Sequence, residues 1–362
     1  MLHIQPQFGD SLDFLALGEV MLRFDPGELR VRCARQFQVW EGGGEYNVAR
    51  GLRKCFGLRT GICTALVDNE VGRLIEDLIL QGGVDTRWLR WVPFDGVGRQ
   101  SRNALNFVER GYGLRAPVGK SDRAHSPTSQ LHIHDFDWQA VFAVSNPRWF
   151  HTGGVFTALG AETPLVANDA VAAARRSKAV VSFDLNYRAS LWNCVADQEA
   201  LRTRNREIVS QTQVVFADPN SARASLGIEV PDMGDSADSG AIFESMSAAL
   251  LNRFGQLEVI GATFRTMGAD GTHGLQGFLW AGGRIHRSRA WTRVESLDRI
   301  GTGDAFAAGV VYGLMDRVDP QLAVDFGTAH ALLATTTPGD NSMASVDDVE
   351  TLLSGAVGLI RR

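Results

Sequence analysis

The sequence of 362 residues has few cysteines, and they stand far apart. Cys33, Cys55, Cys63 and Cys194 show none of the close spacings from which proteins build metal sites. We therefore expect no cysteine-based metal centre. Reduced thiols are typical of cytoplasmic proteins, and we expect the protein to be cytoplasmic.

An excess of basic residues is also missing. Lys and Arg number 36 against 41 for Asp and Glu, so the formal net charge is −5. Because nucleic acids and anionic membranes attract basic proteins, we expect neither partner. No run of about 18 apolar residues could cross a membrane. Residues 1–10 lack the basic and apolar regions of a signal peptide, and we expect them to be a short disordered lead-in.

Internal repeats and linkers are absent from the sequence as well, so we expect no independent domains. Hydrophobic residues make up 44% and charged residues 21%, which is ordinary for a globular protein. Strand-like apolar runs alternate with helical patterns, which predicts an α/β fold with a parallel sheet. The expected strands include residues 13–20, 59–65, 87–92, 179–184, 214–217 and 257–264. The expected helices include residues 70–81, 163–176, 241–254 and 346–353.

Two segments interrupt this alternation. Residues 21–40 mix arginines with apolar residues, and residues 94–123 are rich in glycine and arginine. We expect them to pair into one small β-sheet that forms a lid over the carboxyl edge of the main sheet. The α/β core would then consist of residues 12–20, 41–93 and 124–362.

Residues 298–309 (DRIGTGDAFAAG) are the most informative stretch. Gly301 and Gly303 permit a tight turn, and the apolar run from Asp304 onward predicts a buried helix. Free N–H groups at such a helix start bind anions. A carboxylate there would repel bound phosphate unless it had another task, such as accepting a proton from an attacking hydroxyl. The alternative is an ordinary helix start, where aspartate is common.

A second glycine-rich stretch is residues 40–47 (WEGGGEYN), which leads into another expected helix. Its glycines allow the backbone to approach a ligand, and Asn47 offers both a donor and an acceptor to a polyol. The alternative is a connector that binds nothing. A third polar stretch, Asp184 to Arg188, follows a buried strand at the position where open α/β sheets bind ligands.

Taken in order, residues 42–49 (GGGEYNVA), 268–271 (GADG) and 298–304 (DRIGTGD) resemble the ribokinase-like (PfkB) carbohydrate kinases. Residues 184–188 (DLNYR) and 338–340 (PGD) are most similar to the 2-keto-3-deoxygluconate kinases within that family. The resemblance implies a ribokinase-like three-layer fold, with a mostly parallel central sheet flanked by helices and a small β-sheet lid. It further implies ATP and Mg2+ as cofactors, a sugar or sugar acid as partner, and a homodimer or higher homo-oligomer formed through the lid. A requirement for a monovalent cation stays open.

By the same resemblance, Asp304 is the catalytic base, and the N–H groups of Gly301, Thr302 and Gly303 form the anion hole. The substrate residues that the resemblance implies are Gly43, Gly44, Asn47, Arg123, Arg188 and Asp340. The nucleotide residues that it implies are Thr266, Gly268, Gly271, Gly301 and Gly303.

Arginine is informative because a guanidinium can hold the carboxylate of a sugar acid with two hydrogen bonds. Arg188 follows a buried strand, and its alternative role is an ion pair with Asp184. For Arg123, a solvated surface role is equally open. Asp218 stands where the family commonly has residues that organise magnesium. Asp218 either supplies that carboxylate or caps the next helix.

The sequence therefore favours a kinase that phosphorylates a sugar or sugar acid with ATP, above all 2-keto-3-deoxygluconate to its 6-phosphate. The nearest alternative is a kinase for a neutral sugar, such as fructose or ribose, or for a nucleoside. The alternative of another class is a sugar- and ATP-binding regulatory protein with impaired catalysis.

Overall fold

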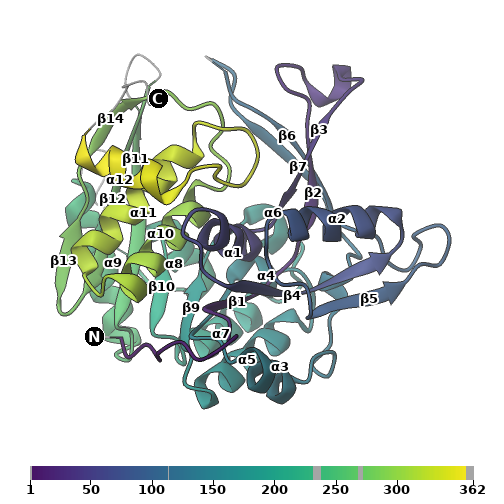
Figure 1. The fold of residues 1–362 in the computed structure, drawn as a ribbon, viewed down its shortest axis with the longest axis horizontal. Helices are drawn as coiled ribbons and strands as arrows, with labels where there is room; N and C mark the ends of the chain where they lie inside the picture. Colours follow the sequence, from purple (N-terminus) through teal and green to yellow (C-terminus); the bar gives the residue numbers. More distant parts are fainter. Residues whose placement is uncertain (1, 113, 231–237, 268–271, 356–362) are drawn as a thin grey trace.

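A computed structural model describes residues 2–112, 114–230, 238–267 and 272–355. Its large sheet has ten strands in the order β13-β12-β11-β10-β9-β8-β1-β4-β5, with β14 paired to β12 (Figure 1). These strands are β1 (Phe14–Leu17), β4 (Thr60–Asp68), β5 (Leu89–Pro93), β8 (Trp149–Gly153), β9 (Val180–Asp184), β10 (Val214–Phe216), β11 (Val259–Met267), β12 (His273–Ala281), β13 (Arg284–Arg287) and β14 (Trp291–Val294).

The strands from β5 to β11 pair in parallel, and β12, β13 and β14 add antiparallel pairs at one edge. The central strands β1 and β8 are buried along their whole length. A strand of continuous apolar residues suits a parallel sheet that is covered on both faces. The mostly parallel α/β sheet that the sequence predicted is confirmed.

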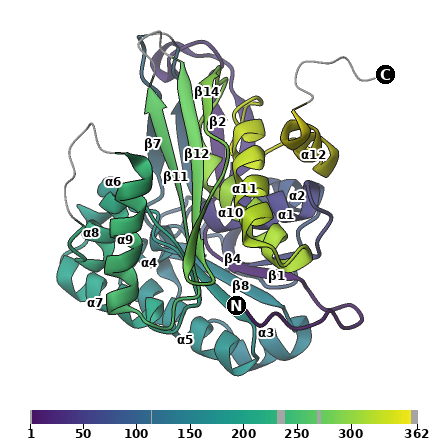
Figure 2. The same cartoon turned by 90° about the vertical axis from the view of Figure 1, so that its left-hand side faces the viewer.

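Helices cover both faces of the sheet and complete three layers, which Figure 2 shows with the sheet seen close to edge-on. One face carries α1 (Gly44–Lys54), α2 (Glu70–Gln81), α10 (Thr302–Asp316), α11 (Pro320–Ala334) and α12 (Val346–Ser354). The other face carries α3 (Trp138–Ser145), α5 (Thr163–Arg176), α7 (Gln198–Val209), α8 (Pro219–Leu226) and α9 (Ser239–Arg253). Shorter helical turns are α4 (Gly154–Thr157), α6 (Ala189–Trp192), η1 (Val31–Cys33) and η2 (Thr128–Gln130).

A second, four-stranded sheet projects from the large one (Figure 1). Its strands, in spatial order, are β3 (Gln38–Gly42), β2 (Met21–Asp25), β6 (Leu105–Glu109) and β7 (Val118–Asp122). The two segments that interrupt the α/β alternation therefore do pair with each other. The lid function of this small sheet and its use as a dimer contact stay predictions.

The buried helix predicted after Asp304 is α10, whose side chains from Ala305 to Met315 are all buried. A Cβ atom on Gly309 would lie 2.6 Å from Cα of Gly327 in α11, so the two backbones touch. This close packing fixes the direction of α10 and brings its first turn to the carboxyl edge of the sheet. None of the helices in the described ranges is long and apolar enough to span a membrane.

Candidate active site

The turn at the start of α10 has the conformation that its glycines predict. Gly301 caps the helix at φ 75°, a left-handed conformation that favours glycine. A Cβ atom on Gly301 would also overlap the carbonyl oxygen of Asp340. The first helical hydrogen bond runs from Ala305 N to Gly301 O at 2.8 Å, so the N–H groups before Ala305 have no helical acceptor. Gly303 is exposed among them, which leaves this helix start open to an anion.

Asp304 in that turn is held by the second glycine-rich stretch. Asn47 Nδ2 donates a hydrogen bond of 2.7 Å to Asp304 Oδ2. Asn47 is itself oriented, because its Oδ1 accepts the backbone N–H of Gly43 at 3.3 Å. The other oxygen, Asp304 Oδ1, faces Gly44, where a Cβ atom would lie 3.8 Å from it. One carboxylate oxygen is thus anchored, and the other points along the glycine run.

Close packing of the backbone also explains why this run consists of glycines. A Cβ atom on Gly43 would overlap the carbonyl oxygen of Glu19, and one on Gly42 would overlap the carboxylate of Asp340. The run therefore packs its backbone against the connection after β1 and against the loop after α11. Substrate contacts of Gly43 and Gly44 stay a prediction.

Burial raises the pKa of three neighbouring acids, Asp304, Asp184 and Glu45, and it also raises the pKa of Asp340 despite the attraction of Arg23. Burial raises the pKa of Asp304 to about 6, and nearby Asp340 adds to this, whereas the Asn47 hydrogen bond and Arg188 oppose it. Burial, with repulsion from Asp304, raises the pKa of Asp184 to about 8 and that of Glu45 to about 7. Three such acids do not all ionise at neutral pH. A carboxyl group with a pKa near neutrality is suited to exchange protons with a substrate.

Glu45 was not predicted as part of this acid group. It is 3% exposed, and a Cβ atom on Gly153 would lie 3.0 Å from its Oε1. Its position one residue before Tyr46 in the glycine-rich stretch was visible in the sequence. The sequence did not indicate that the side chain of Glu45 is buried, and this burial raises its pKa.

The two arginines predicted to bind substrate differ in their surroundings. Arg123 Nε donates to Glu19 Oε2 at 2.8 Å, and Glu19 is 2% exposed. Its charge is therefore compensated within the protein. Arg188 is exposed, its NH1 reaches the carbonyl of Tyr187 at 3.4 Å, and no acid of the described ranges pairs with it within 4 Å. The expected alternative, an ion pair with Asp184, is not formed, and the Arg188 guanidinium is available to a ligand.

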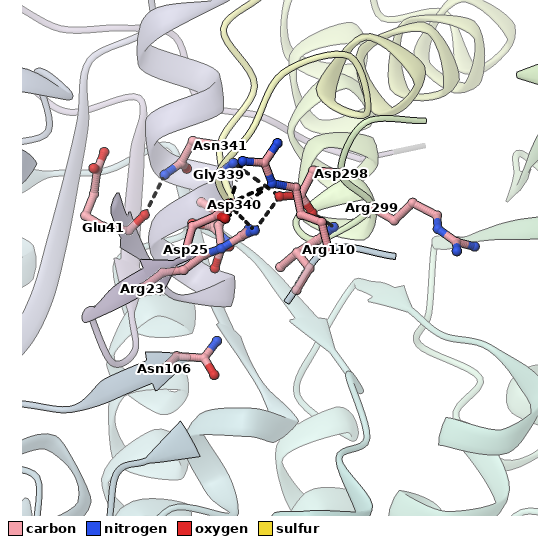
Figure 3. A network of polar contacts seen from close by, with 12 residues as sticks. Arg23, Asp25, Glu41, Asn106, Arg110, Asp298, Arg299, Gly339, Asp340 and Asn341 are labelled. Atoms are coloured by element: carbon pink, nitrogen blue, oxygen red, sulfur yellow. Dashed lines mark hydrogen bonds and ion pairs between the residues drawn. The ribbon is translucent and has the colours of Figure 1, made fainter. Parts of the chain in front are cut away.

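Asp340, predicted to contact substrate, is 6% exposed, and its Oδ1 accepts a hydrogen bond of 2.7 Å from Arg23 NH1 (Figure 3). Asp298, at the start of the DRIGTGD stretch, pairs with the same guanidinium. The two carboxylates next to the turn are thus already compensated by an internal cation. They are a poor fit to a bound monovalent cation, which would have to displace Arg23.

A group of basic residues lies around Arg299, which precedes the turn. Burial, Arg299 and Arg188 together lower the pKa of the Arg265 guanidinium, and Arg299 NH1 lies 3.4 Å from His273 Nδ1. Accumulated positive charge of this kind suits a polyphosphate. Thr266, one of the predicted nucleotide residues, is exposed near the end of β11. Gly268 and Gly271, which were also predicted to bind the nucleotide, lie outside the described residues.

Asp218 caps α8. Its Oδ1 accepts the N–H groups of Asn220 at 2.9 Å and Ser221 at 3.0 Å. Within the described ranges no three His, Cys, Asp or Glu side chains gather in a group that could hold a metal ion. Magnesium commonly takes only one or two protein carboxylates and completes its shell with phosphates and water. Exposed Asp218 fits such an ion, and its role as a ligand stays a prediction.

Comparison with known proteins identifies the family of the chain. The model of the pfkB family carbohydrate kinases matches residues 12–347. A 2-dehydro-3-deoxygalactonokinase of Haloferax volcanii is 25% identical over 346 residues, covering 95% of this chain and 98% of that protein. A 5-dehydro-2-deoxygluconokinase of Shouchella clausii is 26% identical over 356 residues, covering 97% of this chain and 98% of that protein.

Among solved structures, the 2-dehydro-3-deoxygluconokinase of Thermotoga maritima has a TM-score of 0.85 and 29% identity to this chain. The match covers 95% of this chain and 99% of that one. The predicted resemblance and the ribokinase-like fold are confirmed. The chain belongs to the pfkB family of carbohydrate kinases, and it is a sugar kinase.

Proposed function

We propose that this kinase transfers the γ-phosphoryl group of ATP to the 6-hydroxyl of 2-keto-3-deoxygluconate. The observation that carries the proposal is the contact between Asn47 and Asp304 at the open start of α10. It places a carboxylate with a pKa of about 6 next to N–H groups that can stabilise a phosphoryl group. Kinases of this family use ATP, usually with Mg2+.

Asp304 acts as the base in this proposal. Its Oδ1 takes the proton of the 6-hydroxyl group while the hydroxyl oxygen of the sugar forms a bond to the γ-phosphorus. The bond from the γ-phosphorus to the oxygen bridging it to the β-phosphorus breaks, and ADP leaves with that electron pair. Asn47 keeps Oδ2 occupied, so Oδ1 stays directed at the hydroxyl. The N–H groups of Gly301, Thr302 and Gly303 stabilise the charge on the transferring group.

Magnesium, when bound with the nucleotide, would neutralise charge on the β- and γ-phosphates. Asp218 would be its protein ligand, because its carboxylate is exposed. Arg265 and Arg299 supply further positive charge from the protein on the same side.

The surroundings of Arg188 favour a substrate that carries a carboxylate. Its guanidinium is exposed, unpaired within the described residues and close enough to Asp304 to lower that pKa. A carboxylate on the sugar could accept two hydrogen bonds from the N–H groups of Arg188. The three relatives described above are all named for dehydro-deoxy sugar substrates, which agrees with this choice.

The experiment is a coupled assay of ADP release with a panel of sugars. The panel contains 2-keto-3-deoxygluconate, its galactonate epimer, 5-keto-2-deoxygluconate, fructose, ribose and adenosine. We expect the highest kcat/KM for 2-keto-3-deoxygluconate, and phosphorus NMR of the product should show a 6-phosphate. Equal or better turnover of fructose or ribose would favour the neutral-sugar alternative. ATP binding without turnover of any sugar would favour the regulatory protein.

A further inference from the structure

Arg23 is the most completely buried cation of the site region, although it belongs to the small sheet. Its side chain in β2 is 0% exposed, and its guanidinium bonds to three carboxylates (Figure 3). NH1 lies 2.7 Å from Asp340 Oδ1, and NH2 lies 3.2 Å from Asp25 Oδ2 and also bonds to Asp298 Oδ2. Arg23 therefore joins the small sheet to two loops near the catalytic turn.

Both loops shape that turn directly. Asp298 Oδ1 accepts the N–H of Ile300 at 3.2 Å, one residue before Gly301. Asp298 Oδ2 accepts the N–H of Gly339 at 3.3 Å, which ties the turn to the neighbouring loop. The carbonyl of Asp340 lies against Gly301 so closely that a Cβ atom would not fit. Any movement of Asp298 or Asp340 must therefore move Gly301.

The charge balance makes these positions depend on Arg23. Asp25 has a second cation, because Arg110 Nε lies 3.0 Å from its Oδ2. Asp298 and Asp340 have ion pairs with Arg23 and with no other cation among the described residues. Buried carboxylates that lose their cation must either draw in water, take up protons or move apart. Each of these responses would displace the two loops that contain Asp298 and Asp340.

We propose that Arg23 is a positioning residue for phosphoryl transfer, which holds Asp298 and Asp340 together and thereby fixes the Gly301 turn and Asp304. This inference rests on the proposed role of Asp304 as the base. The Arg23 side chain is 0% exposed, so a substrate could not reach it directly. Its effect is transmitted through two carboxylates and the backbone, and it makes the geometry of the catalytic turn depend on the small sheet.

The test compares Arg23→Met with Arg110→Met, a matched control. Both variants remove a guanidinium bonded to Asp25, but only the first removes the partner of Asp298 and Asp340. We expect Arg23→Met to lower kcat by on the order of 10- to 100-fold, the range for a small misplacement of reacting groups, with KM for ATP nearly unchanged. Arg110→Met should keep kcat within about threefold, because it contacts neither loop. Arg23→Lys should restore part of kcat, because an ammonium can still bridge two carboxylates.

Melting temperatures of all variants separate positioning from folding. If Arg23→Met does not fold, Asp298→Asn breaks the same ion pair with a side chain of equal size, and the same fall in kcat is expected. The inference is wrong if folded Arg23→Met, or folded Asp298→Asn, matches Arg110→Met in kcat. Asp304→Asn is measured alongside. Full turnover in that variant would refute the proposed base itself, whereas an inactive Asp304→Asn beside a fully active Arg23→Met would refute only the positioning role.

Discussion

Asn47 at the start of α1 and Asp304 at the start of α10 are 257 positions apart in the chain and are joined by a 2.7 Å hydrogen bond. The bond makes two helix starts meet at one point. One start follows the glycine run before Asn47, and the other has N–H groups without a helical acceptor. In the proposed mechanism, the carboxylate between them is where a hydroxyl group and a phosphoryl group meet.

Replacing the base should abolish turnover without abolishing binding. We expect Asp304→Asn to lower kcat by about 10²- to 10⁴-fold, the usual contribution of a positioned base. Because the amide is neutral and of similar size, the affinity for ATP measured by calorimetry should change little. Near-normal kcat in a correctly folded variant would contradict the role of Asp304.

The acid limb of the pH profile should report on Asp304. The base must be ionised, so kcat/KM is expected to fall as the pH drops below about 6, the pKa of Asp304. The Asn47 hydrogen bond lowers this pKa, so Asn47→Ala should raise it and move the acid limb to higher pH. Profiles of both proteins, measured between pH 5 and 9 on one substrate, provide the comparison. A limb that moves to lower pH would contradict the assignment.

The buried acids should make the free protein less stable at high pH. Asp184 has a folded-state pKa of about 8, above its usual value, so the folded state binds more protons than the unfolded state between about pH 4 and 8. Stability is then lost as the pH rises through that window. We expect Asp184→Asn to raise the melting temperature relative to the natural protein, by more at pH 8 than at pH 5. Glu207→Gln, at a partly exposed position of α7, is the control. A difference independent of pH would contradict this account.

The two arginines should behave differently when removed. Arg188→Ala is expected to raise KM for 2-keto-3-deoxygluconate by about 10- to 100-fold, the loss expected for hydrogen bonds to a charged group, without changing the melting temperature. Arg123→Ala should mainly lower the melting temperature, because it leaves Glu19 buried without its cation. Steady-state kinetics and calorimetry of both variants decide this. An equal effect of Arg188→Ala on fructose would indicate a structural arginine.

Turnover should not depend on a monovalent cation. Arg23 already compensates Asp298 and Asp340, the carboxylates next to the catalytic turn. Replacing K+ by tetramethylammonium at constant ionic strength is therefore expected to leave kcat and KM unchanged. A severalfold loss of kcat in tetramethylammonium would show that a cation binds elsewhere at the site.

The sequence predicted the parts of the site that consist of local motifs. The turn at Gly301 and the glycine run before Asn47 are encoded by consecutive residues, and the helix after Asp304 follows from its apolar residues. These patterns need no knowledge of distant partners. The parallel sheet was predicted from the alternation of strand-like and helical segments, which is also read from consecutive residues.

The remaining features depend on pairings between distant residues. Arg23 was missed because its partners Asp298 and Asp340 are 275 and 317 residues away. Arg123 was expected to be either solvated or bound to substrate, and its pairing with Glu19 follows from how the small sheet meets the core. Helix α3 was not expected at all, since it is short and lies between two loops.

The ion pairs of Arg23 also bear on the order in which a growing chain can become active. The strand with this guanidinium is synthesised 275 residues before Asp298 and 317 residues before Asp340. Until then, the arginine has no partner from either loop, and burying it would be unfavourable. The small sheet can therefore settle in its final place only after both loops have been made, and a fragment that ends before Asp340 would lack one of the two carboxylates that hold the Gly301 turn.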